Sequence, residues 1–101
     1  MKMLMIVARL SMLAELEQLL RDQGITTYTI LNKVAGKGKA GRVYQTLLDG
    51  EANLVIMTVL PCDQADKMVS ALKKIHAARV KAARGQVIPL KVFSLPCEEH
   101  I

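Results

Sequence analysis

The residues best suited to chemistry are three glycines and three cations between Gly36 and Arg42. The segment reads Gly-Lys-Gly-Lys-Ala-Gly-Arg and comes just after a strand-like run over 25–34. Glycines let backbone N–H groups approach an anion closely, and neighbouring cations complete a site of about the size of a phosphate. The segment therefore predicts anion or nucleotide binding, and it offers no side chain suited to catalysis.

The positive charge of the chain is concentrated in two clusters. The net charge is +5, with four cations and no acid over 33–42 and five cations and no acid over 73–84. Either cluster alone is equally well explained as the solvated face of a loop or of a helix end. Glycines accompany only the first cluster, and they favour a binding site there.

Length and composition indicate one globular domain spanning 1–101. The chain has 101 residues, of which 51% are hydrophobic, enough for a single core. No apolar run approaches the roughly 18 residues of a membrane span, and the start lacks a signal-peptide cleavage site. Cys62 and Cys97 form no C-x-x-C pair, so we expect reduced thiols and a cytoplasmic protein without membrane insertion.

Apolar spacing predicts the element order βαββαβ. The predicted strands cover 2–8, 25–34, 53–60 and 90–95, and the predicted helices cover 12–23 and 63–84. Ser11 fits the N-cap of the first helix and Gly24 its stop, while Asp63 and Asp66 form a capping arrangement for the second. The segment 36–52 is a loop between the second and third strands.

This order predicts an α+β, ferredoxin-like sandwich: a four-stranded antiparallel sheet with two helices on one face. The strand 53–60 is apolar on both sides, with Leu54, Ile56 and Leu60 on one face and Val55, Met57 and Val59 on the other. Two helices cover only one face of such a sheet, so we expect another subunit to cover the second. The alternative is an apolar face used for some other partner.

Other chemistry has weaker support. Cys97-Glu98-Glu99-His100 offers soft and borderline metal ligands, although a frayed polar terminus explains it more simply. The two histidines, His76 and His100, do not complete a nucleophile–base arrangement, so we expect no enzyme. Nucleic-acid binding on such a sheet needs aromatic residues on the first and third strands, which have none.

Several short motifs resemble the PII signalling proteins and their PII-like relatives in the PII/CutA superfamily. The run from Lys91 to Glu99 resembles the lysine-led last core strand of the family and its Leu-Pro-x-Glu-Glu ending. Leu60-Pro61-Cys62-Asp63-Gln64 resembles its strand-to-helix junction, and Gly24-Ile25 and Thr29 also fall where the family places them. The resemblance covers nearly the whole chain.

The resemblance implies a homotrimer that binds ATP, ADP or AMP in clefts between subunits, with no obligatory cofactor. It also implies that the mobile loop over 36–52 docks onto a target protein. Residues that match nucleotide-binding positions are Thr29, Gly36, Lys37, Gly38, Lys39, Arg42 and Lys91. Gly-Lys-Gly followed by an arginine is most similar to the subgroup linked to bicarbonate uptake and carboxysomes. Bicarbonate is therefore a second candidate ligand, and a transporter or carboxysome component a candidate partner.

The chain departs from the family in one important segment. Residues 78–90 lack the family's Thr-Gly turn and its Gly-Asp-Gly, and Met57 replaces a carboxylate of the third strand. Arg79, Lys81 and Arg84 are substitutes by charge alone. An alternative function is that of a metal-responsive PII/CutA-like protein associated with divalent-ion tolerance, with Cys97 and His100 as ligands.

Overall fold

The computed structural model describes residues 1–34, 36–38, 41–43, 53–84 and 88–101. The elements in chain order are β1 (Lys2–Arg9), a 3-10 turn (Leu10–Met12), α1 (Leu13–Asp22), β2 (Thr29–Val34), β3 (Gly36–Gly38), β4 (Gly41–Val43), β5 (Asn53–Leu60), α2 (Cys62–Ala82) and β6 (Lys91–Pro96). Apart from the small β3–β4 pair, this is the predicted βαββαβ order.

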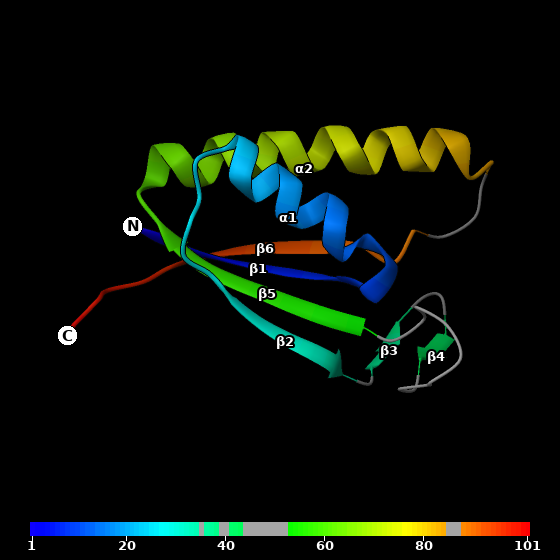
Figure 1. Cartoon of the computed structure of the whole chain (residues 1–101), viewed down its shortest axis with the longest axis horizontal. Coiled ribbons are helices and arrows are strands. Elements are labelled where there is room, and N and C mark those ends of the chain that lie inside the picture. Colours follow the sequence, from blue (N-terminus) through cyan, green and yellow to red (C-terminus); the bar gives the residue numbers. More distant parts are fainter. Residues whose placement is uncertain (35, 39–40, 44–52, 85–87) are drawn as a thin grey trace.

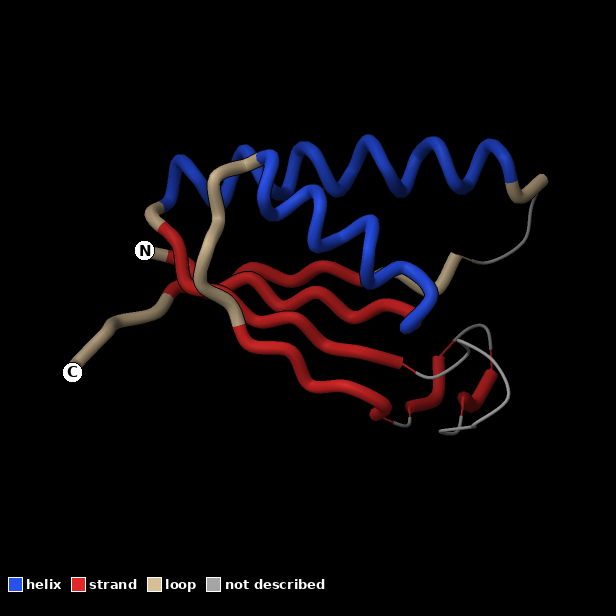
Figure 2. The backbone as a smooth tube through the Cα atoms, viewed as in Figure 1, coloured by secondary structure: helices blue, strands red, loops and turns tan. Residues whose placement is uncertain are grey.

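The main sheet has four strands in the order β2-β5-β1-β6, and every neighbouring pair is antiparallel. Both helices lie on the same side of this sheet (Figures 1 and 2). The predicted α+β, ferredoxin-like sandwich is confirmed. Its two central strands are β5 and β1, which are the most apolar, and β2 and β6 form the edges.

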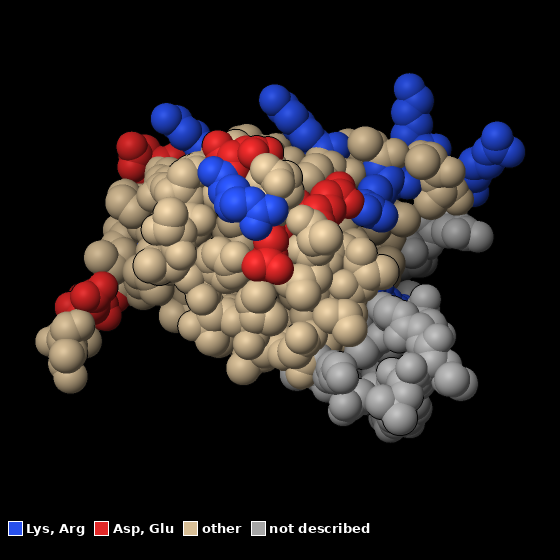
Figure 3. Space-filling view, in the orientation of Figure 1, with Lys and Arg blue, Asp and Glu red and all other residues tan. Residues whose placement is uncertain are grey.

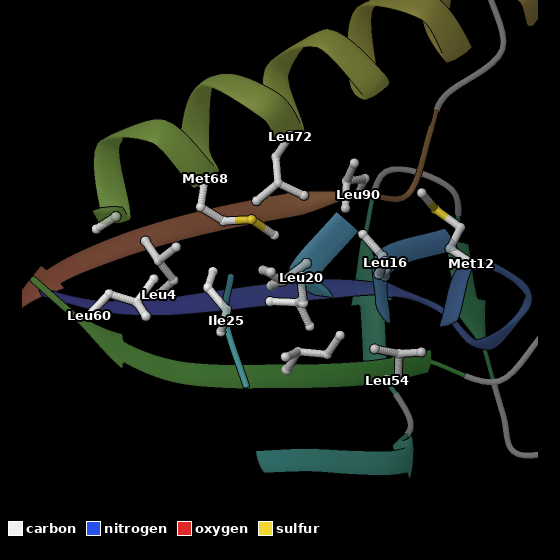
Figure 4. Packing of buried hydrophobic residues seen from close by; sticks show 14 residues of the cluster. Leu4, Met12, Leu16, Leu20, Ile25, Leu54, Leu60, Met68, Leu72 and Leu90 are labelled. Atoms are coloured by element: carbon white, nitrogen blue, oxygen red, sulfur yellow. The ribbon is translucent and has the colours of Figure 1, made fainter. Parts of the chain in front are cut away.

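The core lies between the helices and the sheet. Alternate residues of β1 and β5 point toward the helices, and these residues are buried while their neighbours are not. The buried hydrophobic side chains that Figure 4 labels are Leu4, Met12, Leu16, Leu20, Ile25, Leu54, Leu60, Met68, Leu72 and Leu90. One continuous apolar layer therefore joins both helices to the sheet.

Gly24 ends α1 as predicted. Its φ is +73°, a left-handed conformation that glycine adopts without steric cost. The N–H of Gly24 donates to the carbonyl of Arg21 at 3.0 Å, and the N–H of Ile25 donates to that of Leu20 at 2.8 Å. These two bonds form a Schellman motif, which satisfies the last carbonyls of the helix and directs Ile25 into the core.

The predicted N-caps of both helices are wrong. Ser11 lies inside the 3-10 turn and is exposed, while the neighbouring Met12 is buried and stands at the cap position of α1 without a side-chain bond. Burial of the methionine decides this start. The helix α2 begins at Cys62, directly after Pro61, and no side chain caps it, so Asp63 in its first turn contributes only through the helix dipole.

The second strand begins four residues later than predicted. Residues 25–28 cross from the helix layer to the edge of the sheet, with Ile25 buried in the core. The Thr58 hydroxyl donates to the backbone carbonyl of Thr27 at 2.8 Å and so holds this crossing against β5. The β-rich composition of 25–28 therefore serves a connection between layers.

The connection between β2 and β5 contains a short antiparallel hairpin that the sequence did not predict. The strands β3 and β4 pair with each other and form a separate two-stranded sheet beyond the end of β2 (Figure 1). Residues 35, 39–40 and 44–52 of the predicted loop lie outside the described residues.

Candidate functional site

The hairpin β3–β4 brings the ends of the glycine-rich segment together. Gly36 pairs with Val43, Lys37 with Arg42, and Gly38 with Gly41. Two of the predicted anion-binding cations, Lys37 and Arg42, are thus direct cross-strand partners. Lys39, the third predicted cation, lies outside the described residues.

Lys91 lies at the same end of the sheet as the hairpin. It begins β6 and pairs with Val7 of β1, which in turn pairs with Val55, near the start of β5. The last residue of β2, Val34, pairs with Asn53 at that same end. The chain therefore gathers the hairpin and the exposed Lys91 at one end of the sandwich.

Thr29 lies apart from these groups. It begins β2 at one edge of the sheet and pairs with Met57, while Lys91 belongs to β6 at the opposite edge. Three inter-strand spacings of about 4.8 Å separate the two edges, or roughly 14 Å. A single chain does not bring Thr29 and Lys91 together.

Thr29 lines a hollow of about 490 Å³ near the C-terminal segment. The other lining residues are Met3, Thr27, Tyr28, Met57, Thr58, Val59 and Glu99. Its walls mix thioethers and hydroxyls, and Glu99 is its only charged lining residue among the part of the chain that the structure describes. The sequence did not single out this hollow, because its walls come from four separate segments.

Tyr28, which lines this hollow, is hydrogen-bonded to the helix α1. Its hydroxyl donates to Oε2 of Glu17 on α1 at 2.6 Å. This hydrogen bond is the main cause that raises the pKa of Tyr28 above its ordinary value of 10.0. The bond holds the residue before Thr29 against α1, so the start of β2 has a defined position.

The sheet face away from the helices is apolar. Its most exposed side chains, each between 41% and 52% accessible, are Leu31, Val59, Phe93 and Leu95. Met5 and Met57 face each other between them as register partners in β1 and β5. We call this surface the open face. Apolar residues on both sides of 53–60 predicted the centre of this face, whereas Phe93 and Leu95 of the edge strand were not predicted as part of it.

The residues of the metal alternative do not form a site within the chain. His100 pairs with Glu98 at 3.7 Å, and both side chains are at least 80% exposed. Among the described residues no three His, Cys, Asp or Glu side chains are close enough to hold a metal ion. Near Cys97, the α-amino group of Met1 donates to Sγ of Cys62 at 3.1 Å, and the Cys97 N–H donates to the Met1 carbonyl at 3.4 Å.

The family of the chain follows from comparison with known proteins. The model of the family described as nitrogen regulatory protein P-II matches residues 1–100. The chain belongs to the P-II family. Members of this family are regulatory proteins by description. A search of the curated proteins gives no significant match.

Solved structures of CPII, a nitrogen regulatory PII-like protein from Thiomonas intermedia K12, share the fold of this P-II family chain. One, bound to ADP, AMP and bicarbonate, superposes with a TM-score of 0.76 at 20% identity and covers 93% of this chain and 82% of that chain. Another, bound to ADP and bicarbonate, has a TM-score of 0.69 at 20% identity, covering 93% and 84%. The apo form has a TM-score of 0.67 at 18% identity, covering 93% and 85%.

The helices of this P-II family chain pack on the sheet or lie at its surface. None of the helices in the described residues combines the length and the apolar character that a membrane crossing requires.

Proposed function

We propose that this chain is a regulator that binds an adenine nucleotide in clefts between the subunits of a homotrimer. The observation that carries the proposal is the position of Lys37 and Arg42, directly paired at the end of the sheet that also holds Lys91. Lys37 and Arg42 suit the phosphates of a nucleotide, and Lys91 lies at the same end of the sheet but on the opposite edge strand. The separation of Thr29 from this end supports a site completed by a second subunit.

Bicarbonate is the second proposed ligand. It is a small anion, and backbone N–H groups beside lysine and arginine suit such ions. Support comes from CPII, whose solved structures are described as bound to ADP with bicarbonate, or to ADP and AMP with bicarbonate or acetate. We propose a role in inorganic-carbon metabolism in the cytoplasm, without catalysis.

The segment 36–52 is the proposed output of the regulator. A nucleotide held by Lys37 and Arg42 would neutralise both strands of the hairpin and favour one of its conformations. A target protein, such as a transporter or a carboxysome component, would then bind according to the ligand present. No observation on the described residues favours the metal-responsive alternative.

Isothermal titration with ATP, ADP and AMP, each with and without bicarbonate, tests this function. We expect micromolar binding by a trimer, and about tenfold weaker binding for Arg42→Ala and for Lys37→Ala, because each loses a charge-assisted bond to phosphate. Lys73→Ala, a cation of α2 far along the chain from the hairpin, is the control and should bind like the parent protein. Equal affinity in all four proteins would contradict the assignment of the hairpin.

A further inference from the structure

The C-terminal half of α2 is longer than packing requires. The buried residues of this helix are Ala65, Met68 and Leu72; among residues 73–82, all of them described, none is fully buried, Ile75 packs partly buried against the core and Arg79 pairs with Glu15 of α1. At about 1.5 Å per residue the helix is roughly 31 Å long, against about 26 Å for β5 at about 3.3 Å per residue. Figure 1 shows α2 extending past the strands. Packing on the sheet therefore does not explain the end of the helix beyond Arg79, where residues 80–82 are exposed.

Exposed residues form a straight line along α2 on the side away from the core. We call this line the α2 stripe; it consists of Lys67, Ser70, Lys74, Ala77 and Lys81. Its spacing alternates between three and four residues, which keeps all members on one side of a helix that turns about 100° per residue. Met68 and Leu72 point to the opposite side. From position 67 to position 84 the sequence has no acid.

The lysines of the α2 stripe are available for a partner. None of the three has an ion-pair partner among the described residues, since the nearby Asp66 pairs with Lys2 at 3.0 Å and Glu15 pairs with Arg79. Lysine and arginine side chains project from the surface where α2 lies (Figure 3). The first half of the stripe also lines a shallow hollow of about 390 Å³ beside Gln23.

A further cation continues the charge beyond the helix. Arg84 follows the C-cap residue Ala83 and has a φ of 50°, in the left-handed region. A bulky residue adopts this conformation at a steric cost, and the sequence offers a glycine at the next position. Arg84 extends the basic surface of α2 past its last turn.

We propose that the α2 stripe is a docking surface for an acidic helix of a partner protein. Seven residues of any α-helix rise by about 10.5 Å, so Lys67, Lys74 and Lys81 have the same spacing as acids at heptad positions of a helix that runs alongside. The small Ser70 and Ala77 between the lysines let the partner backbone approach closely. The cations proposed above for the nucleotide, Lys37, Arg42 and Lys91, are not part of this surface, so the inference goes beyond the proposed function.

Other anionic partners fit the stripe less well. A lipid surface is bound most strongly when apolar side chains insert beside the cations, and Val80, the exposed apolar residue of α2 at 43% accessible, points about a quarter turn away from the stripe. A nucleic-acid backbone winds around its axis, whereas the lysines lie along a straight line. An acidic helix matches both the length and the straightness of α2.

Fluorescence anisotropy with a labelled, alanine-rich helical peptide of about 20 residues tests the proposal. The peptide carries glutamates at heptad spacing, and an isomer of the same composition distributes them around the helix. We expect the heptad peptide to bind at least about fivefold more tightly than the isomer, and Lys74→Glu and Lys81→Glu each to weaken binding by about threefold to tenfold. Arg21→Glu on α1 is the control of equal charge change and should bind as the parent does.

Three outcomes would overturn the proposal. Equal binding of the two peptides would show that spacing is irrelevant, and equal weakening by Arg21→Glu and Lys74→Glu would show a general effect of net charge. Tighter binding to duplex DNA or to phosphatidylglycerol vesicles than to the heptad peptide would assign the stripe to another partner. All three substituted positions are exposed, so we expect each variant to fold. Circular dichroism of each variant verifies that its helices are intact.

Discussion

The two faces of β5 carry side chains of similar character but have different surroundings. Ile56 and Leu54 are fully buried because α1 and α2 cover them. On the other face, Val59 is 41% accessible because no part of the described chain lies over it. The sequence of a strand therefore specifies how its side chains are divided between the two faces of the sheet. It does not specify what covers each face. One face contributes to folding, and the other is free to contribute to assembly.

The largest effect expected from this comparison is on the covered face. Ile56→Ala removes three carbons from a side chain with no exposed surface and leaves a cavity between the sheet and the helices. We expect the free energy of unfolding to fall by about 2–5 kcal/mol. Urea denaturation followed by circular dichroism measures this loss. Val59→Ala on the open face is the matched control, and an equal loss there would remove the distinction between the faces.

A charge on the open face should act on assembly. Met57→Asp places a carboxylate at the centre of this face, beside its register partner Met5. If copies of the chain pack on the open face, burial of the charge should weaken trimer formation by at least about tenfold. Analytical ultracentrifugation measures the mass, and Asp63→Asn on α2 serves as the control. A Met57→Asp protein that keeps the mass of the parent would mean that something else covers this face.

The smallest effect concerns the bond that links the two layers at Tyr28. The pKa of Tyr28 is raised because its hydroxyl donates to Glu17, so the neutral phenol is favoured in the folded state. This contribution to stability is complete below the ordinary pKa of about 10 and is lost as the pH rises through the higher folded value. We expect the melting temperature of the parent to fall between pH 10 and 11 more than that of Tyr28→Phe.

Parallel melting curves at both pH values check this prediction. The pKa of Lys2 is also raised, because its side chain bonds to Asp66. The bond between Lys2 and Asp66 weakens over the same alkaline range in both proteins. Only the difference between the two proteins therefore reports on Tyr28. Identical curves would show that the bond between Tyr28 and Glu17 contributes nothing measurable to the folded state.

The sequence was sufficient for the elements whose signals are local. The apolar run that ends before Pro61 predicted 53–60 correctly, and Gly24 predicted the end of α1, because both signals depend only on neighbouring residues. It failed where distant packing decides. Residues 25–28 have the composition of a strand, but in the fold they connect the helix layer to the sheet. The first helix starts after the buried Met12, although Ser11 has the greater tendency to cap a helix.

The candidate site shows the same division. Its cations were visible in the sequence, since glycines and lysines in alternation mark a close approach to an anion. The pairing of Lys37 with Arg42 was not visible in the sequence, because glycine has a low strand propensity and gives no local signal of a hairpin. The separation of Thr29 from Lys91 depends on strand order, which no single segment encodes.

The methionines of the open face give it a chemical vulnerability that the core does not share. Met5 and Met57 are partly exposed, whereas Met68 under α2 is fully buried. Oxidation turns a thioether into a polar sulfoxide, which no longer packs as an apolar group. In a subunit that has not assembled, peroxide would therefore reach the open face while sparing the core, and reduction by a methionine sulfoxide reductase would restore the thioethers.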